Sequence, residues 1–317
     1  MPTRSFLWAA VGLPLVLAGG PSAAESFIVD LTHVMPTFEP LGGDITQPDL
    51  TKPYGDSQAI PTFGVQTVLQ ISEFPTNQGH FDLGRLVLSE HHGTHIDSPG
   101  HYANTPETTE PGNPPRKLAH ELTVDDLVGP AVLIDIGARV QAELDKNGGK
   151  PSPDTGVTDF SDHSPNVVTA DDIAAVADRL GNGVWLVVNL GWSRFYHDAD
   201  WATTPYFNGW NFPGLNNAAI DKLIEIEDAK GIRINGIVID NIGVDTGQAS
   251  KGSDDKWTDS FRSHVRGLQR GWKFVENATN LGQLAMATPG SCTIVIGAPN
   301  HVRGTGGPSR VLAMCER

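Results

Sequence analysis

Short apolar runs and amphipathic segments alternate along most of the chain. Runs typical of β-strands occupy residues 65–74, 84–91, 130–137, 184–192 and 234–245. Apolar residues recur at helical spacing over 169–181 and 216–231, and Thr169 is placed to cap the first of these two helices. Since no shift of composition marks a linker, the pattern predicts a single α/β domain.

The N-terminal segment has a different pattern. A basic residue precedes a short apolar run, after which Ser22 and Ala24 occupy the positions of a small-x-small cleavage site. The apolar run is too short and too interrupted for a stable membrane span, although an uncleaved anchor is the alternative. We therefore expect residues 1–24 to be a signal peptide and residues 25–317 to form a secreted or periplasmic domain without a membrane span.

Charge narrows the range of partners. The 317 residues include 22 Lys and Arg against 37 Asp and Glu, which gives a formal net charge of −15. The basic residues are scattered along the chain, and this argues against nucleic acid and anionic membrane surfaces as partners.

The chain has two cysteines, Cys292 and Cys315, each in a short apolar stretch. A turn-rich segment separates them, and a hairpin centred near Arg303 and Gly304 would place them opposite each other. In an oxidising compartment this arrangement favours a disulfide, whereas two buried free thiols are the alternative.

The stretch SEHHGTHIDSPGHY, residues 89–102, carries the strongest chemical signal. Even numbers of residues separate its four candidate ligands, so in an extended backbone they point to the same side: His91, His95, Asp97 and His101. The adjacent His92 would face away and serve a structural role. Imidazole and carboxylate groups together are a ligand set for Zn²⁺, Mn²⁺ or Fe²⁺, so the cluster predicts a metal site.

The segment HHGTHIDSPGH matches the signature His-x-Gly-Thr-His-x-Asp-x-Pro-x-His and thereby resembles the cyclase family of metal-dependent amidohydrolases. That family includes bacterial kynurenine formamidases and isatin hydrolases. The stretches VDLTH, GWSRFY and GVDTG are also similar to the family, and GTGGPSRVLAM is most like its isatin hydrolase branch. The resemblance implies a mixed sheet whose β-layers pack against helices, and a homo-oligomer, either a dimer or a tetramer.

The resemblance also implies roles for individual residues. It assigns the metal ligands to the histidine cluster and to a second pair twelve positions apart: His91, His95, Asp97, His264 and Glu276. His101 would be the catalytic acid and base. The second pair lies in residues 260–277, which we expect to be helical before the chain bends. One or two ions of Mn²⁺ or Zn²⁺ would be bound.

Two further groups of residues are candidates for the site. Four aromatic residues could form the walls of a pocket for a flat substrate, although core packing is the better explanation for any single one of them: Trp192, Phe207, Trp210 and Phe212. Asp240 and Asp245 follow a predicted strand, where they would either face a site or cap a turn.

These observations predict a metal-dependent hydrolase that cleaves the C–N bond of a small-molecule amide by activating water. A cyclic aryl amide such as isatin is the favoured substrate class. The alternatives are an arylformamidase acting on N-formylkynurenine, a lactonase, and a non-catalytic periplasmic protein that binds a metal or a ligand. Because binding alone does not require His101, its presence favours an enzyme.

Overall fold

The structure is a computed structural model, and it describes residues 24–34, 67–72, 83–87, 90–102, 116–196, 205–251 and 261–317. The expected signal peptide lies outside these ranges except for Ala24, so export remains a prediction. Among the described helices, none has the length and apolar character needed to cross a membrane.

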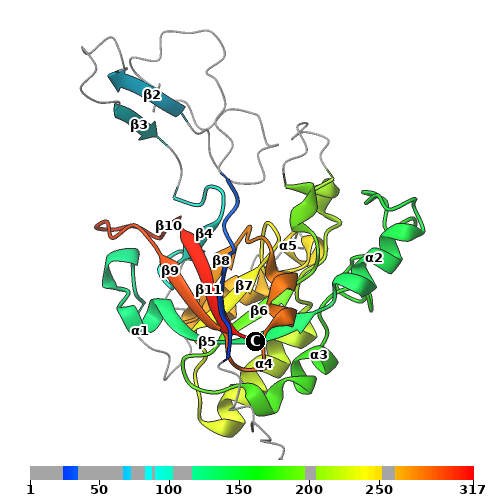
Figure 1. Cartoon of the computed structure of the whole chain (residues 1–317). Coiled ribbons are helices and arrows are strands. Elements are labelled where there is room, and N and C mark those ends of the chain that lie inside the picture. Colours follow the sequence, from blue (N-terminus) through cyan, green and yellow to red (C-terminus); the bar gives the residue numbers. More distant parts are fainter. Residues whose placement is uncertain are drawn as a thin grey trace, which may run out of the picture.

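A nine-stranded mixed sheet forms the centre of the molecule, in the order β1-β11-β9-β5-β6-β7-β8-β4-β10 (Figure 1). Its strands are β1 (Ser26–Asp30), β4 (His95–Asp97), β5 (Val128–Asp135), β6 (Trp185–Asn189), β7 (Gly236–Ile239), β8 (Lys273–Glu276), β9 (Thr293–Gly297), β10 (Gly306–Pro308) and β11 (Arg310–Glu316). Strands β5 to β8 pair in parallel, and the pairs on both flanks are antiparallel. Strands β2 (Thr67–Ser72) and β3 (Leu83–Val87) form a separate antiparallel pair.

The central strands are apolar on both faces because both faces are covered. In β6, Leu186 and Val188 belong to one hydrophobic core, whereas Trp185 and Val187 belong to a second core on the opposite face. The first core also contains residues of the helices. The second is closed by β1, β9, β11 and a 3-10 segment, Leu281–Met286. The predicted α/β fold with a mixed sheet is therefore confirmed.

The described α-helices are α1 (Val124–Leu127), α2 (Gly137–Asp145), α3 (Ala170–Ala175), α4 (Asn217–Lys230) and α5 (Gly247–Lys251). Helix α4 begins where the side chain of Asn216 accepts a hydrogen bond from the Ala219 amide, and it ends at Gly231, whose left-handed φ of 65° favours glycine. Ile220 and Leu223 of α4 are fully buried and attach the helix to the sheet.

Two predicted helices are shorter than the sequence pattern indicates. Thr169 does cap α3 through a capping box, but the helix ends at Ala175 and a 3-10 turn follows (Ala177–Arg179). In the second, the helical turns end before Gly271, whose φ is 89°, and the chain continues as β8. Pairing with β7 and β4 outweighs helical periodicity there, so Glu276 lies on a strand and not on a helix.

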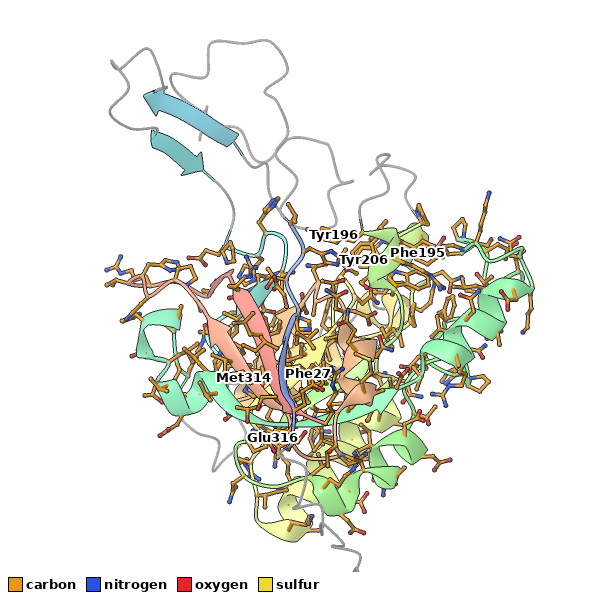
Figure 2. All side chains as sticks on the ribbon, viewed as in Figure 1. Phe27, Phe195, Tyr196, Tyr206, Met314 and Glu316 are labelled. Atoms are coloured by element: carbon orange, nitrogen blue, oxygen red, sulfur yellow. A yellow bond between two sulfur atoms is a disulfide. The ribbon has the colours of Figure 1, made fainter. Side chains whose placement is uncertain are left out.

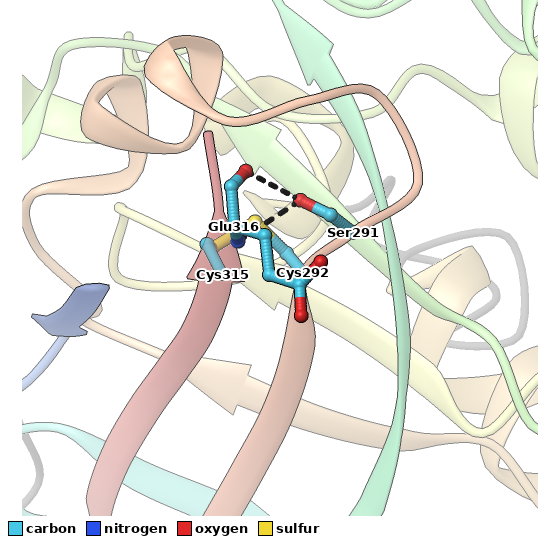
Figure 3. Close-up of a disulfide and its surroundings, with 4 residues drawn as sticks. All are labelled: Ser291, Cys292, Cys315 and Glu316. Atoms are coloured by element: carbon cyan, nitrogen blue, oxygen red, sulfur yellow. Dashed lines mark hydrogen bonds between the residues drawn. A yellow bond between two sulfur atoms is a disulfide. The ribbon is translucent and has the colours of Figure 1, made fainter. Parts of the chain in front are cut away.

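The disulfide between Cys292 and Cys315 is present, with an S–S distance of 2.02 Å (Figure 3). Strands β9 and β11 pair with Thr293 opposite Met314, and this register places the two cysteines side by side. The alternative of free thiols is wrong. The connection between these strands is wider than a tight hairpin, because β10 leaves it to pair with β4.

Candidate metal centre

Strand β4 positions the centre because it lies between β8 and β10 near one edge of the sheet. Its antiparallel register with β8 sets His95 directly opposite Glu276. Directly opposed residues of antiparallel strands have neighbouring side chains, so sheet pairing alone brings these two potential ligands together. His264 comes from a π-helical turn, Ser263–Gly267, that precedes β8.

The side chains of His91, His95, Asp97 and His101 come together, but not through one continuous strand as their even spacing suggests. Only His95 and Asp97 lie on a strand. His91 precedes them on a turn that includes Gly93 with φ of 64°, and His101 follows on a bend after the Pro-Gly pair. These turns, and not a continuous extended backbone, direct the side chains to one point. His92 is buried as well, and its structural role remains a prediction.

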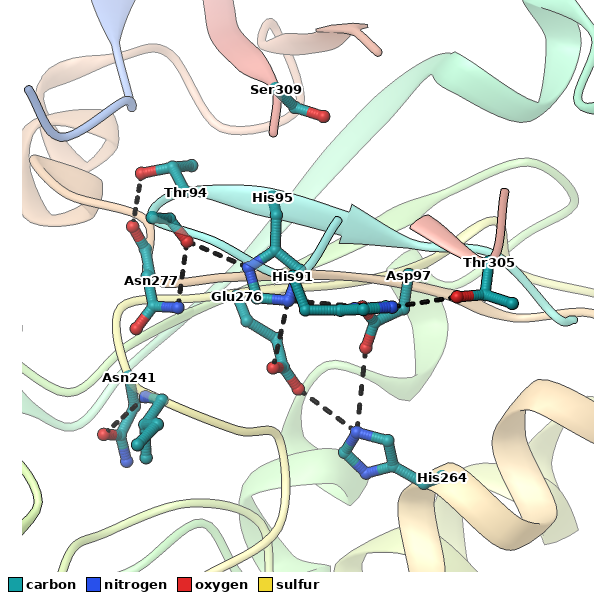
Figure 4. A network of polar contacts seen from close by, with 12 residues as sticks. His91, Thr94, His95, Asp97, Asn241, His264, Glu276, Asn277, Thr305 and Ser309 are labelled. Atoms are coloured by element: carbon teal, nitrogen blue, oxygen red, sulfur yellow. Dashed lines mark hydrogen bonds and ion pairs between the residues drawn. The ribbon is translucent and has the colours of Figure 1, made fainter. Parts of the chain in front are cut away.

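Asp97 is the centre of the arrangement (Figure 4). Its Oδ1 lies 2.6 Å from Nδ1 of His91 and 3.3 Å from Nε2 of His95, and its Oδ2 lies 3.7 Å from Nε2 of His264. Glu276 closes the group, with Oε2 at 3.6 Å from Nε2 of His95 and Oε1 at 3.3 Å from Nε2 of His264. All five predicted ligands therefore meet in one place.

The donor set fits a divalent metal ion. Asp97 and Glu276 are 1% and 4% exposed, yet Asp97 Oδ2 and Glu276 Oε1 accept no hydrogen bond from any described residue. Uncompensated buried carboxylate oxygens are costly unless they meet a cation. Among the described residues, two sets of three side chains could each hold a metal ion, because the donor atoms within a set all lie within 4.8 Å of one another. One set is His91, Asp97 and His101, and the other is His95, Asp97 and Glu276.

Hydrogen bonds on the outer side of the rings fix two of the histidines. His95 holds its Nδ1 2.9 Å from the carbonyl of Gly93, and His264 holds its Nδ1 2.9 Å from Oδ2 of Asp245. A ring nitrogen that donates outward leaves the other nitrogen with a lone pair for a metal. Asp245, considered from sequence as either a site residue or a turn cap, thus supports His264 and is itself held by the amide of Ser263 at 2.8 Å.

The charges in the metal-free centre depend on one another. Burial opposes ionisation of Asp97, but the neighbouring His101 and His91 outweigh it and hold its pKa well below the ordinary value. Burial and the charge of Asp97 raise the pKa of Glu276. Burial also opposes protonation of His264, but Asp245, Asp97 and Glu276 outweigh it and raise the pKa of its ring. A strongly negative pocket that attracts protons is also a pocket that attracts a metal cation.

His101 lies against His91, with ring centroids 3.8 Å apart and planes inclined by 34°. Burial, together with the neighbouring histidines His91, His264 and His95, lowers the pKa of His101 to about 4 even though Asp97 opposes the shift. The ring is therefore neutral near pH 7 and able to accept a proton.

The residues of the predicted aromatic wall belong to the packing of the first hydrophobic core. Trp192 and Phe212 are buried in the hydrophobic core, and Phe207 and Trp210 pack against it. Their ring contacts are with one another and with Phe160 and Phe195, in agreement with the core-packing alternative. Figure 2 shows Phe195, Tyr196 and Tyr206 close to one another in the same part of the molecule.

The aromatic rings that do adjoin the centre were missed by sequence reasoning. Tyr102, Phe261 and Phe274 all contact the ring of His264, at centroid distances of 5.5, 5.6 and 5.2 Å. Tyr102 follows His101 directly in the chain, a signal that could have singled it out. Phe261 offers no such signal, because only folding brings it beside Tyr102.

Known proteins resemble this chain in sequence and in fold. A sequence model of the Cyclase family matches residues 29–246, more than half of the chain, so the protein belongs to the cyclase family. The isatin hydrolase of Roseibium aggregatum is 28% identical over 291 residues, which cover 87% of this chain and 94% of that protein. Together, the family and this likeness support a hydrolase.

Two solved structures share the fold. One is an isatin hydrolase bound to the product analogue thioisatinate, with 24% identity, a TM-score of 0.63, and coverage of 92% of this chain and 94% of that one. The other is isatin hydrolase A from Labrenzia aggregata bound to benzyl benzoate, with 23% identity, a TM-score of 0.61 and the same coverage. The family match ends before His264 and Glu276, whose place in the centre therefore rests on the structure.

Proposed function

We propose that this protein is an exported, metal-dependent hydrolase that opens a cyclic aryl amide of the isatin type. The observation that carries the proposal is the buried centre in which two carboxylates meet three histidines whose nitrogens point inward, and in which one oxygen of each carboxylate accepts no hydrogen bond from a described residue. The likeness to isatin hydrolase over most of both chains supports the choice of substrate class.

The side chains divide the work between holding a cation and moving a proton. His91, His95, Asp97, His264 and Glu276 would hold one or two ions of Zn²⁺ or Mn²⁺. When bound, such an ion lowers the pKa of water and polarises the substrate carbonyl. His101, neutral near pH 7, takes up a proton on a ring nitrogen and returns it to the departing amide nitrogen.

The aromatic rings beside the centre suit a flat substrate. Tyr102 and Phe261 lie 5.9 Å apart between ring centroids, and both are only partly buried. Rings in this position contact a planar aryl group and exclude water from one side of the reacting carbonyl.

One experiment tests the proposal on a single sample. The purified mature chain is analysed for bound metal and assayed with isatin and with N-formylkynurenine. We expect a stoichiometric divalent metal and opening of isatin. In His101→Asn we expect turnover to fall by about 100-fold or more, because proton transfer is lost, while metal content is unchanged.

The exposed His163 provides a matched control, and His163→Asn should leave both readouts unchanged. Preference for N-formylkynurenine would overturn the cyclic substrate and favour the formamidase. Failure to bind zinc or manganese after reconstitution would overturn the metal mechanism altogether.

A further inference from the structure

Behind His91, on the side away from Asp97, two side chains continue the network. Thr305 places its Oγ1 3.0 Å from Nε2 of His91, as Figure 4 shows. The same hydroxyl donates to Oε2 of Glu90 at 2.7 Å, and the Thr305 amide donates to that oxygen at 2.9 Å. The other oxygen of Glu90 lies 2.7 Å from Nε2 of His301.

The direction of these hydrogen bonds follows from their chemistry. A threonine hydroxyl carries one hydrogen, and a carboxylate can only accept. Because the Thr305 hydrogen points to Glu90, its oxygen offers His91 only a lone pair. Nε2 of His91 is therefore the nitrogen that can donate to Thr305, which leaves Nδ1 for a metal ion. In the metal-free protein Oδ1 of Asp97, 2.6 Å from Nδ1, is also only an acceptor and competes for the ring hydrogen.

His91 differs in this respect from the other two ligand histidines. His95 and His264 both bond outward through Nδ1 and present Nε2 to the centre. His91 presents Nδ1, so it needs an acceptor on the opposite edge of its ring. Thr305 supplies that acceptor from 214 residues further along the chain.

The backbone holds Thr305 in place independently of its side chain. Its carbonyl accepts hydrogen bonds from the amide and the hydroxyl of Ser98, at 2.9 and 2.8 Å. The next residue, Gly306, lies so close that an added Cβ would meet the Ile96 carbonyl at 2.4 Å and Cε1 of His91 at 2.7 Å. Changing the hydroxyl therefore alters the network while leaving the position of the strand.

We propose that Thr305 and Glu90 are a positioning pair that accepts a hydrogen bond from Nε2 of His91 when Nδ1 holds a metal ion, and thereby sets the metal affinity of the centre. The proposal deepens the proposed function and rests on it, since it assumes that His91 is a ligand. Neither residue of the pair contacts substrate in this role.

In Glu90→Gln the side-chain amide can donate to Thr305, which frees the hydroxyl to donate to His91 and removes the acceptor for the Nε2 hydrogen. We expect this variant to bind Zn²⁺ more weakly than the wild type. Zinc binding as tight as in the wild type would contradict the role of Glu90.

Metal affinity is measured for each variant as the Zn²⁺ dissociation constant, by competition with a chromogenic chelator. Loss of an outer hydrogen bond to a ligand histidine weakens metal binding by about 10- to 100-fold, which is the change expected for Thr305→Val. Thr305→Ser restores the hydroxyl and should restore the affinity. Zinc binding as tight in Thr305→Val as in the wild type would contradict the proposal.

A serine close to Thr305 in the chain provides a control. Ser309 is a buried hydroxyl residue just after β10, and it donates to the Gly307 carbonyl at 2.8 Å without touching His91. Ser309→Ala should leave zinc affinity unchanged. Weaker zinc binding by Thr305→Val in a protein that hydrolyses neither amide would support the positioning pair and contradict the proposed function. If the protein hydrolyses isatin and Thr305→Val binds zinc as tightly as the wild type, the proposed function is supported and the positioning pair is contradicted.

Discussion

Asp240 is a buried carboxyl group at the end of β7, outside the metal centre. It is 1% exposed, and it accepts hydrogen bonds from the amides of Leu190 at 2.8 Å and Trp192 at 2.9 Å. Burial raises its pKa to about 6, although the backbone amides oppose the shift. Asp240 therefore ties the loop after β6 to the end of β7, in agreement with the turn-capping alternative.

The raised pKa gives a pH dependence of stability with a definite sign. Between the unfolded pKa near 3.8 and the folded pKa near 6, the folded state binds more protons, so this group's contribution to stability falls as pH rises. We expect the difference in unfolding free energy between wild type and Asp240→Asn to narrow by up to about 3 kcal/mol from pH 4 to pH 7. Urea unfolding at several pH values measures it, and a constant difference would contradict the assignment.

The disulfide makes a prediction for β9 and β11 as a pair of elements. It closes a loop with a sequence separation of 23, which restricts the unfolded chain. The double variant Cys292→Ser, Cys315→Ser should lose about 3 kcal/mol of unfolding free energy, measured by urea denaturation. Ser291→Ala is a matched control, because it removes the exposed hydrogen bond to the Glu316 carbonyl beside the same bridge and should cost much less. Equal losses in the two variants would show that the bridge adds little.

At the scale of elements, prediction from sequence succeeded where apolar periodicity and local caps agree. Helix α4 has both an Asn216 cap and a Gly231 terminus, and its prediction is confirmed within a residue. The prediction failed for 273–276, because four residues carry too little periodicity to distinguish a strand from the end of a helix. Only pairing with β7 and β4 decides that segment.

At the scale of the whole molecule, the metal centre joins segments that are far apart in sequence. His91 and Asp97 come from the region before α1, whereas His264 and Glu276 come from beyond α5. In the metal-free protein the charge of Asp97 disfavours ionisation of buried Glu276, and a bound cation relieves this repulsion. Removing the metal should therefore destabilise the entire fold.

We expect a chelator such as EDTA to lower the thermal unfolding midpoint by about 5 to 10 °C, as follows from loss of a ligand bound well above its dissociation constant. Calorimetry before and after chelation measures the change, and added zinc or manganese should restore it. In Asp97→Asn the chelator should have little effect. A wild-type midpoint that is insensitive to both chelator and metal would contradict a structural contribution of the centre.

The sequence by itself predicted the α/β class, the disulfide partners and the cluster of His91, His95, Asp97 and His101, because each depends on local periodicity or on spacing along the chain. His264 and Glu276 were identified only through resemblance to a family, since nothing local distinguishes them from surface residues. Tertiary structure decided which nitrogen of each histidine faces Asp97, that Trp192 and Phe212 belong to the core, and that Thr305 supports His91. These features depend on contacts between strands and turns distant in sequence, and such contacts leave no periodic trace in the chain.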